Sequence, residues 1–443
     1  MGSSMNVLDD ELNIVVIGAG LGGLAVALAL RTATSRHVIT VLESAPALAE
    51  IGAGLQITPN AAKLLIRWGL GDQLQKVTTV PEQFTIYRYS NGEVLGKRDN
   101  YGAEMLAKYG APFWDVHRAD LQIAMYERAK NLGIKFRFSA QVESYDLATP
   151  KAILQGGEEV HADLIIAADG LWSRCRSSML GYIASPTPTG DLAYRIVLNF
   201  DQVKDPEVLR FLSKPQVHLW AGPDCHAIYY PLRNNTMCNI VLLVPDNLPE
   251  NVARAPGSID EMKEIFRNWD PILQKLLSLV TDVDKWKLMH REEMDAWSNE
   301  HATVAFLGDS CHPMLPYMAQ GANSSIEDGA ALGVLLSKLS KKEDLASILQ
   351  VYQDLRKPRS TAIAKSSEKQ RYYNHLPDGA EQKVRDALMK SQIQEPQPGY
   401  PFYWIDPQMQ SWVYGYDADL EAHTAWDKFL KDSKQKTLPG AQL

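Results

Sequence analysis

The feature that most constrains this chain is Gly18-x-Gly20-x-x-Gly23, which directly follows the apolar run 14–17. In such a turn the first glycine permits a tight bend, the second lets the backbone approach a phosphate, and the third lets the next helix pack on the strand. The free N–H groups at the start of that helix then face the phosphates. The motif therefore predicts a Rossmann-type α/β unit that binds a dinucleotide.

Glu43 indicates which class of dinucleotide the motif binds. It ends the next apolar run, 38–42, and lies twenty residues after Gly23, where a carboxylate can accept hydrogen bonds from ribose hydroxyls. A second negative charge at this place would be repelled, so we expect the adenosine of FAD or NAD rather than the 2′-phosphorylated adenosine of NADP. The spacing alone does not distinguish FAD from NAD.

Composition excludes several other classes of protein. The 443 residues are 45% hydrophobic and carry a formal charge of -8, so the chain can bury a sizeable core and offers no basic surface for nucleic acid or an anionic membrane. Its most apolar stretch, 14–30, contains four glycines and is too short to span a bilayer. The polar residues 1–12 do not resemble a secretory signal, and no HExxH or CxxC pattern supports a metal site. We expect a cytoplasmic protein with reduced cysteines, either a monomer or a homodimer.

The pattern of elements predicts two domains, the first of which is interrupted. Residues 1–185 begin the nucleotide-binding domain, residues 291–370 complete it, and residues 371–443 form a helical, aromatic-rich tail. Alternating segments at 194–200, 216–220, 226–232 and 237–244 predict an antiparallel sheet domain over 186–290. We expect residues 76–115 also to contribute to the substrate side. Helices are predicted at 60–68, 119–131 and 325–339, and buried strands at 164–168 and 303–307.

Three later motifs resemble those of a known family. Asp169-Gly170-x-x-Ser173-x-x-Arg176 resembles the DGxxSxxR motif of the class A FAD-dependent aromatic monooxygenases, Gly308-Asp309 their GD motif, and residues 117–121 their HRxDL segment. The segments 52–60, 312–328 and 412–417 are similar to the salicylate hydroxylase branch. The resemblance implies a para-hydroxybenzoate hydroxylase-like fold of the α/β class. Such a fold has a Rossmann-type FAD-binding domain, an inserted, mainly antiparallel substrate sheet and a helical C-terminal segment.

The same resemblance implies a site for non-covalent FAD. Asp309 would hold the ribityl chain, Arg118 would lie near the phosphates, and Asp169 near both the flavin and the nicotinamide. Backbone N–H groups at the start of a helix would face the flavin and stabilise negative charge on it. The full set of expected cofactor residues is Gly18, Gly20, Gly23, Glu43, Arg118, Asp169, Asp309, Gly321, Ala322 and Asn323. Asp309 and Asp169 each have a simpler interpretation as a helix cap.

In this family NADH or NADPH reduces FAD, and O₂ then gives a flavin C4a-hydroperoxide that transfers one oxygen atom to a phenol. The resemblance therefore implies hydroxylation of a small, salicylate-like phenol. The alternative is a monooxygenase of secondary metabolism that acts on a polyketide-type phenol, with or without hydroxylative dearomatisation. The lack of a second GxGxxG agrees with a nicotinamide that binds only transiently.

Four residues are expected on the substrate side. Arg195 aligns with an arginine that holds the phenolate in family members acting on phenols, and Tyr230 aligns with an active-site tyrosine. Strand alternation places His226 on the same face as Tyr230. Pro316 would lie over the flavin edge where oxygen reacts. In the alternative interpretation Arg195 pairs with a surface acid, Tyr230 packs on the sheet, and Pro316 stiffens a loop.

Other function classes fit the sequence less well. Asp309, Ser310 and His312 are nearly adjacent and no GxSxG motif is present, which argues against a serine hydrolase. A purely structural or regulatory dinucleotide-binding protein would keep the first glycine motif and lose the flavin motifs, which here are complete. A membrane-bound oxidase is opposed by the lack of an apolar tail after residue 404.

Overall fold

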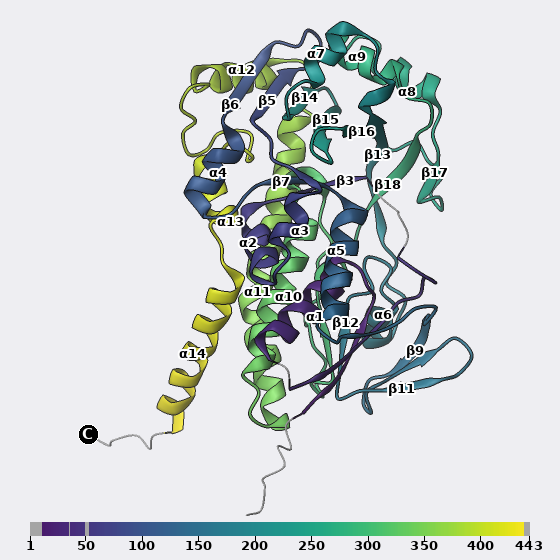
Figure 1. Ribbon diagram of the computed structural model, residues 1–443, viewed down its shortest axis with the longest axis vertical. Coiled ribbons are helices and arrows are strands. Elements are labelled where there is room, and N and C mark those ends of the chain that lie inside the picture. The colour runs from purple at the N-terminus through teal and green to yellow at the C-terminus, as the bar shows by residue number, and fades with distance from the viewer. Residues whose placement is uncertain (1–10, 35, 49–52, 438–443) are drawn as a thin grey trace, which may run out of the picture.

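The computed structural model describes residues 11–34, 36–48 and 53–437 and has a tall, two-part α/β shape (Figure 1). The α/β class predicted from the sequence is confirmed. Two sequence-based interpretations fall partly outside the described residues, namely residues 1–10 of the amino-terminal segment and Gly52 of the segment 52–60.

A five-stranded parallel sheet forms the centre of the nucleotide-binding part. Its strand order is β19-β12-β1-β2-β8, so the last strand in the sequence lies beside one from the first half of the chain. The strands are β1 (Asn13–Ile17), β2 (Val38–Leu42), β8 (Lys135–Arg137), β12 (Leu164–Ala167) and β19 (Val304–Phe306). Buried parallel strands are near-continuous apolar runs, which is why the sequence pattern identified β1, β2, β12 and β19. The edge strand β8 is short and only partly buried, and it was not predicted.

Helices and two small sheets accompany this sheet, and one of the helices, α4, packs against β5 of the second part. The helices are α1 (Leu21–Ala33), α2 (Pro59–Arg67), α3 (Gly71–Gln75), α4 (Tyr101–Tyr109), α5 (Arg118–Asn131), α6 (Arg174–Leu180), α10 (Gly321–Ser337) and α11 (Leu345–Asn374). One small sheet contains β9 (Val142–Asp146), β10 (Lys151–Leu154) and β11 (Glu159–His161), and the other contains β3 (Gly54–Ile57), β4 (Thr78–Thr79) and β7 (Trp114–His117). Short 3₁₀ turns lie at η1 (Phe200–Gln202), η2 (Gly308–Ser310), η3 (Pro316–Met318) and η4 (Lys342–Asp344). Helix α10 starts four residues earlier than predicted, because residues 321–324 carry no apolar stripe.

Helices α1 and α10 pack together unusually closely. A Cβ atom added to Gly329 would lie 2.6 Å from the backbone nitrogen of Val26, and one added to Gly333 would lie 2.6 Å from Cβ of Ala29. Residue numbers rise together along the two helices, so α1 and α10 run parallel. Their N-termini therefore lie at the same end of the pair.

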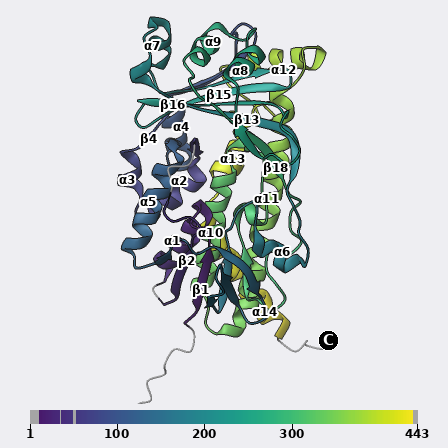
Figure 2. The same cartoon turned by 90° about the vertical axis from the view of Figure 1, so that its right-hand side faces the viewer.

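An eight-stranded, mainly antiparallel sheet forms the second part (Figure 2). Its order is β17-β18-β13-β16-β15-β14-β5-β6. The strands are β5 (Gln83–Arg88), β6 (Val94–Asp99), β13 (Thr187–Asn199), β14 (Gln216–Gly222), β15 (Cys225–Leu232), β16 (Met237–Pro245), β17 (Arg254–Pro256) and β18 (Asp284–His290). Two strands thus come from the segment 76–115, and the β14–β5 pair is parallel. The alternation of apolar residues predicted the four central strands. The pairing of β14 with β5 joins segments more than 120 residues apart, and no local sequence pattern predicts it.

The two faces of this sheet have different partners. Helices α7 (Pro206–Leu212), α8 (Ile259–Ile265) and α9 (Pro271–Ser278) cover the outer face, where they pack on alternate residues of β13 such as Leu192 and Tyr194. The residues between them, Ala193 and Arg195, belong to the inner face, and Ala193 packs against the loop that contains Tyr317. The inner face is therefore directed toward the nucleotide-binding part.

The C-terminal segment does not form a separate unit. The predicted boundary at residue 370 falls inside α11, and α12 (Ala380–Ser391), α13 (Pro407–Tyr414) and α14 (Ala418–Thr437) follow it. Aromatic residues Phe402 and Trp404 share a core with Phe84 of β5, while Trp426 of α14 packs into the core around α10. The segment thus buries apolar surface against both parts.

The α1–α10 contact makes a testable prediction. Gly329→Ala should lower the free energy of unfolding by about 1 to 3 kcal/mol, because the added methyl group overlaps the α1 backbone. Alanine otherwise favours a helix over glycine, so a loss would come from the packing. Chemical denaturation measures the effect, with Gly379→Ala, where the nearest atom to the new methyl group is 4.0 Å away, as the control. Equal stability of both variants would contradict this account.

Candidate active site

The three motif glycines have three different surroundings. Gly18 has a φ of +99° and its added Cβ would lie 2.7 Å from the oxygen of Ala168, while a Cβ on Gly23 would lie 2.0 Å from the oxygen of Gly18. Gly20, which precedes the first turn of α1, has no atom within 4 Å of an added Cβ. Two of the glycines are thus required by the fold, and Gly20 leaves the start of α1 open to a phosphate.

Glu43 lies beside the glycine turn. Its Oε2 accepts a hydrogen bond from the nitrogen of Ala19 at 2.8 Å, and its Oε1 accepts from the nitrogen of Ala45 at 2.9 Å. The side chain is only partly buried. The carboxylate is therefore held at the end of β2, next to the N-terminus of α1.

Asp309 is the exposed residue in a turn whose neighbours are buried. Ser310 Oγ donates to the oxygen of Ala167 at 2.8 Å, and the nitrogen of Gly308 donates to Asp328 Oδ2 at 3.0 Å. Within the described ranges the Asp309 carboxyl forms no hydrogen bond or ion pair, so it does not act as a helix cap. The Asp309 side chain is exposed, but the protein around it displaces part of its hydration, and this desolvation raises the pKa of Asp309. The charges of His312 and Arg118 partly oppose the effect.

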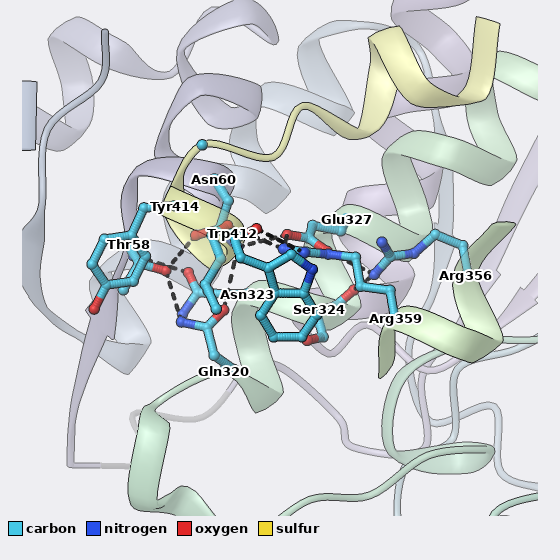
Figure 3. A network of polar contacts seen from close by, with 12 residues as sticks. Thr58, Asn60, Gln320, Asn323, Ser324, Glu327, Arg356, Arg359, Trp412 and Tyr414 are labelled. Atoms are coloured by element: carbon cyan, nitrogen blue, oxygen red, sulfur yellow. Dashed lines mark hydrogen bonds and ion pairs between the residues drawn. The ribbon is translucent and has the colours of Figure 1, made fainter. Parts of the chain in front are cut away.

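The start of α10 also presents unused donors. No hydrogen bond is made by the backbone N–H groups of Gly321, Ala322 and Asn323 within the described part of the chain. The side chain of Asn323 is occupied, because its Oδ1 accepts from Thr58 N at 3.0 Å and its Nδ2 donates to Ala319 O at 2.6 Å. Figure 3 shows Asn323 enclosed with Thr58 and Gln320. Only the backbone of Asn323 is thus free for a ligand.

The HRxDL segment places Arg118 and Asp120 in different surroundings. The Arg118 side chain is exposed and forms no ion pair or hydrogen bond with any residue that the structure describes, while its backbone nitrogen donates to the oxygen of Ala53 at 3.2 Å. Asp120, two residues later, accepts from Arg233 Nε at 2.8 Å and Nη2 at 2.9 Å. Because Arg233 lies in the turn between β15 and β16, this pair clamps the sheet domain to α5.

Asp169 acts at least in part as a helix cap, which was the simpler of the two interpretations. Its Oδ2 accepts from the nitrogens of Arg174 at 3.0 Å and Cys175 at 3.2 Å in the first turn of α6. Its Oδ1 is buried without a hydrogen bond in the described structure, and burial raises the pKa of the carboxyl. The cofactor contact expected of Asp169 stays a prediction.

Arg195 lies on the inner face of the sheet and has no acidic partner among the described residues. Its guanidinium carbon is 4.4 Å from the ring centroid of Trp286, and Arg254 lies 4.5 Å from the same centroid. Burial lowers the pKa of Arg195, and nearby Arg118 adds to this. The interpretation of Arg195 as half of a surface salt bridge is therefore not supported.

Tyr230 is buried one row further along the same face. It lies opposite Asn239 in the β15–β16 pair, and a Cβ added to Gly54 would lie 2.4 Å from its ring. Burial raises the pKa of Tyr230 and Asp115 raises it further, while Arg195 acts in the opposite direction. The structure thus brings Tyr230 near Arg195, and its hydroxyl forms no hydrogen bond with the described residues.

His226 is bound to a residue that the sequence did not suggest. Its Nδ1 is 2.7 Å from Nε2 of His375 at the end of α11, and its ring lies 5.4 Å from that of Tyr317. Burial lowers the pKa of both histidines, that of His375 to about 4, so both rings are neutral near pH 7. Pro316 is exposed beside Tyr317, in a loop whose neighbours Leu315 and Tyr317 pack on the inner face.

Several contacts of the site have no sequence signal. Distant segments meet in the fold and so bring Trp286 to Arg195, His375 to His226 and Asp328 to Gly308. The described residues contain no cluster of three or more side chains suited to a metal ion. None of the helices in the described ranges is long and apolar enough to cross a membrane.

Comparison with known proteins gives a consistent result. The sequence matches the family described as "FAD binding domain" over residues 11–367. It is 46% identical over 424 residues to FAD-dependent monooxygenase OpS4 of Beauveria bassiana (strain ARSEF 2860), covering 95% of this chain and 99% of that protein. It is 31% identical over 416 residues to 3-hydroxybenzoate 6-hydroxylase of Klebsiella oxytoca, covering 93% and 99%. A substrate complex of salicylate hydroxylase shares the fold, with a TM-score of 0.76, 23% identity and coverage of 94% and 98%.

The geometry around Asp309 predicts how FAD retention responds to mutation. The protein should purify yellow and release intact FAD when it is denatured. Asp309→Ala should weaken FAD binding by about tenfold or more, since it removes a charged acceptor, whereas Ser310→Ala removes a neutral hydrogen bond to Ala167 and should cost less. Flavin fluorescence during titration measures both. Equal weakening in the two variants would count against the role of Asp309.

Proposed function

Because this chain belongs to the class A FAD-dependent aromatic monooxygenases, we propose that it uses NAD(P)H and O₂ to hydroxylate a small phenol held as an anion. The family predicted from the motifs is confirmed, and with it the fold. The substrate and the roles of individual residues are proposals. So are the cytoplasmic location and the monomeric or homodimeric state.

The residues present fit FAD on several independent observations. Gly20 leaves the start of α1 open, Glu43 lies beside it, and Asp309 is exposed without a partner in the described structure. The parallel packing of α1 and α10 places two helix N-termini at one end, which suits a ligand with a pyrophosphate and a ring that becomes negative on reduction. We propose that Glu43 holds the adenosine ribose, Asp309 the ribityl chain, and the N–H groups of Gly321 and Ala322 the flavin.

Reduced FAD supplies the activation of O₂, which no amino-acid side chain can provide. The contribution of the protein is placement and charge. Arg195 keeps its positive charge at any relevant pH and can stabilise a phenolate, whose ring is more electron-rich than that of the phenol. Tyr230 can donate its hydroxyl proton in a hydrogen bond to the same oxygen, since burial keeps it protonated.

His226 can accept the proton that the phenol loses. Its Nε2 has no hydrogen bond in the described structure, while Nδ1 contacts His375. We propose that Nε2 takes the proton and that Nδ1 passes one to Nε2 of His375, whose ring is partly exposed. Neutral imidazoles are required for such a transfer, and burial provides them.

One observation carries the substrate assignment, namely a guanidinium on the inner face that stacks on an indole and has no carboxylate in the described structure. Arginine side chains that are partly buried, as Arg195 is, normally have an acidic partner. An anionic ligand would provide it. A planar phenol with an ortho carboxylate or carbonyl offers both the negative charge and a flat shape.

A polyketide-type phenol remains the second candidate. Identity is 46% to the fungal monooxygenase OpS4, whose name specifies no benzoate, and 31% to the 3-hydroxybenzoate 6-hydroxylase. The discriminating experiment is a screen of substrate-stimulated NADH and NADPH oxidation across hydroxybenzoates and polyketide phenols, with product analysis. Hydroxylated benzoates as products support the first proposal, and turnover restricted to larger phenols supports the second.

Arg195→Ala should cripple turnover while FAD stays bound. Losing a contact to a charged ligand should cost about 2 to 5 kcal/mol in kcat/KM, and Tyr230→Phe should cost less. Arg254→Ala is the matched control, because Arg254 stacks on the same Trp286 but is paired with Asp284 and half-exposed. Its effect should be within a few tenths of a kcal/mol. Normal turnover in Arg195→Ala would place the activating cation elsewhere.

Flavin reduction should depend on the substrate. Without a bound phenol, the two electrons of NAD(P)H would reduce O₂ to hydrogen peroxide and no product would form. We therefore expect NAD(P)H to reduce the flavin slowly alone and faster when an accepted phenol is present. Anaerobic stopped-flow absorbance measures the reduction rate directly. Equal rates with and without every phenol tested would contradict substrate gating and would leave the hydroxylation itself intact.

A further inference from the structure

Asp328 is a fully buried carboxylate of α10 that contacts the Asp309 turn on both sides. Its Oδ2 accepts from the backbone nitrogen of Gly308 at 3.0 Å and lies 2.5 Å from Nε2 of His312. Its Oδ1 accepts from Nε of Arg356 at 2.8 Å. One side chain therefore binds the residue before Asp309, the histidine three residues after it, and helix α11.

Charge supports this arrangement. Burial alone would raise the pKa of Asp328, but His312 and Arg356 outweigh it and lower the pKa to about 2. The pKa of His312 is raised by Asp328 despite burial. The pair is thus a buried ion pair, with His312 also stacked on Trp297 at a centroid distance of 4.9 Å.

The buried N–H group of Gly308 depends on Asp328 as its acceptor. Gly308 has a φ of +61°, and a Cβ added there would lie 2.6 Å from Ser325 Oγ, so its backbone is fixed in a conformation that favours glycine. Its N–H group would be buried and unpaired without Asp328. Such an unpaired donor is costly, so loss of the carboxylate would favour a different turn.

The neighbouring residue Glu327 provides a natural comparison. It is equally buried and also binds Arg356, at 2.8 Å. Its other partners are Asn60 Nδ2 at 2.6 Å and Arg359 Nη2 at 2.8 Å. In Figure 3 Glu327 lies between Arg356 on one side and Asn60 on the other. Glu327 therefore shares the ionic network with Asp328 but forms no hydrogen bond or ion pair with the Asp309 turn in the part of the chain that the structure describes.

We infer that Asp328 is a positioning residue for the cofactor site, which fixes the turn 308–312 so that the Asp309 carboxyl stays exposed toward FAD. The inference rests on the proposed contact between Asp309 and the ribityl chain. It assigns to the segment 312–328 a role that its resemblance to the salicylate hydroxylase branch did not specify. Asp328 itself acts only through the turn.

The test is a double-mutant cycle on the FAD dissociation constant of the holoenzyme, measured by flavin fluorescence on dilution. In Asp328→Asn the amide NH₂ group faces a donor in either orientation, Gly308 N–H or Arg356 Nε–H. The variants are Asp328→Asn, Asp309→Ala and their combination. Glu327→Gln serves as the matched control, and the melting temperature of each variant is recorded.

We expect Asp328→Asn to raise the dissociation constant by about tenfold, and Glu327→Gln to raise it by less than about threefold at a similar drop in melting temperature. In the Asp309→Ala background Asp328→Asn should add less than about twofold, because the two residues act on one contact. The inference would be overturned if Asp328→Asn left the FAD dissociation constant unchanged, or raised it by the same factor with and without Asp309→Ala. An increase of the same size in Glu327→Gln would also overturn it.

A second variant keeps the test decisive if Asp328→Asn does not fold. His312→Leu removes one of the two links to the turn, because leucine has no donor, and leaves the Asp328–Arg356 pair intact. It should show a smaller loss of FAD that is likewise suppressed by Asp309→Ala, and an unsuppressed loss would overturn the inference. An unchanged dissociation constant in Asp309→Ala alone would instead contradict the ribityl contact, a failure separate from that of Asp328.

Discussion

The close parallel packing of α1 on α10 is the constraint on which the rest of the molecule depends. Gly329 and Gly333 approach the α1 backbone so closely that no side chain fits between. The whole sheet domain separates these helices in the sequence, yet their N-termini lie at one end. Two positive helix ends placed together repel each other, and an anionic ligand relieves that repulsion. The packing that completes the nucleotide-binding part thus also creates its preference for a negatively charged cofactor.

Helix α10 has a different function on each of its surfaces. Its glycine face contacts α1, its first turn presents free N–H groups, and its buried carboxylates Glu327 and Asp328 bind Arg356 and Arg359 of α11. Buried ion pairs contribute little net stability because of desolvation. Here they join α11, the C-terminal segment and the Asp309 turn in one network, since Arg359 also donates to the oxygens of Trp412 and Val413. Their effect is to fix geometry.

The sequence predicted what local pattern can encode. Apolar runs identified four of the five strands of the parallel sheet, alternation identified the four central strands of the second sheet, and the glycine motif with Glu43 located the nucleotide end. The start of α10 at Gly321 was not predicted, because Gly, Ala, Asn and Ser at residues 321–324 show no apolar periodicity typical of a helix. The pairing of β14 with β5, the His226–His375 contact and the Asp328 contact join segments far apart in the chain. Only the folded structure could reveal them.

The stacking of Arg195 on Trp286 explains how the inner face can hold a cation without neutralising it. A carboxylate partner would occupy the N–H groups of the guanidinium, whereas an aromatic face stabilises the charge and leaves those donors free in the plane. Nearby Arg118 adds positive charge, Arg254 on the same ring is already paired with Asp284, and neither arginine offers Arg195 an acceptor. A neutral phenol would leave this charge uncompensated. The site therefore gains most from a substrate that enters as an anion or becomes one beside Arg195.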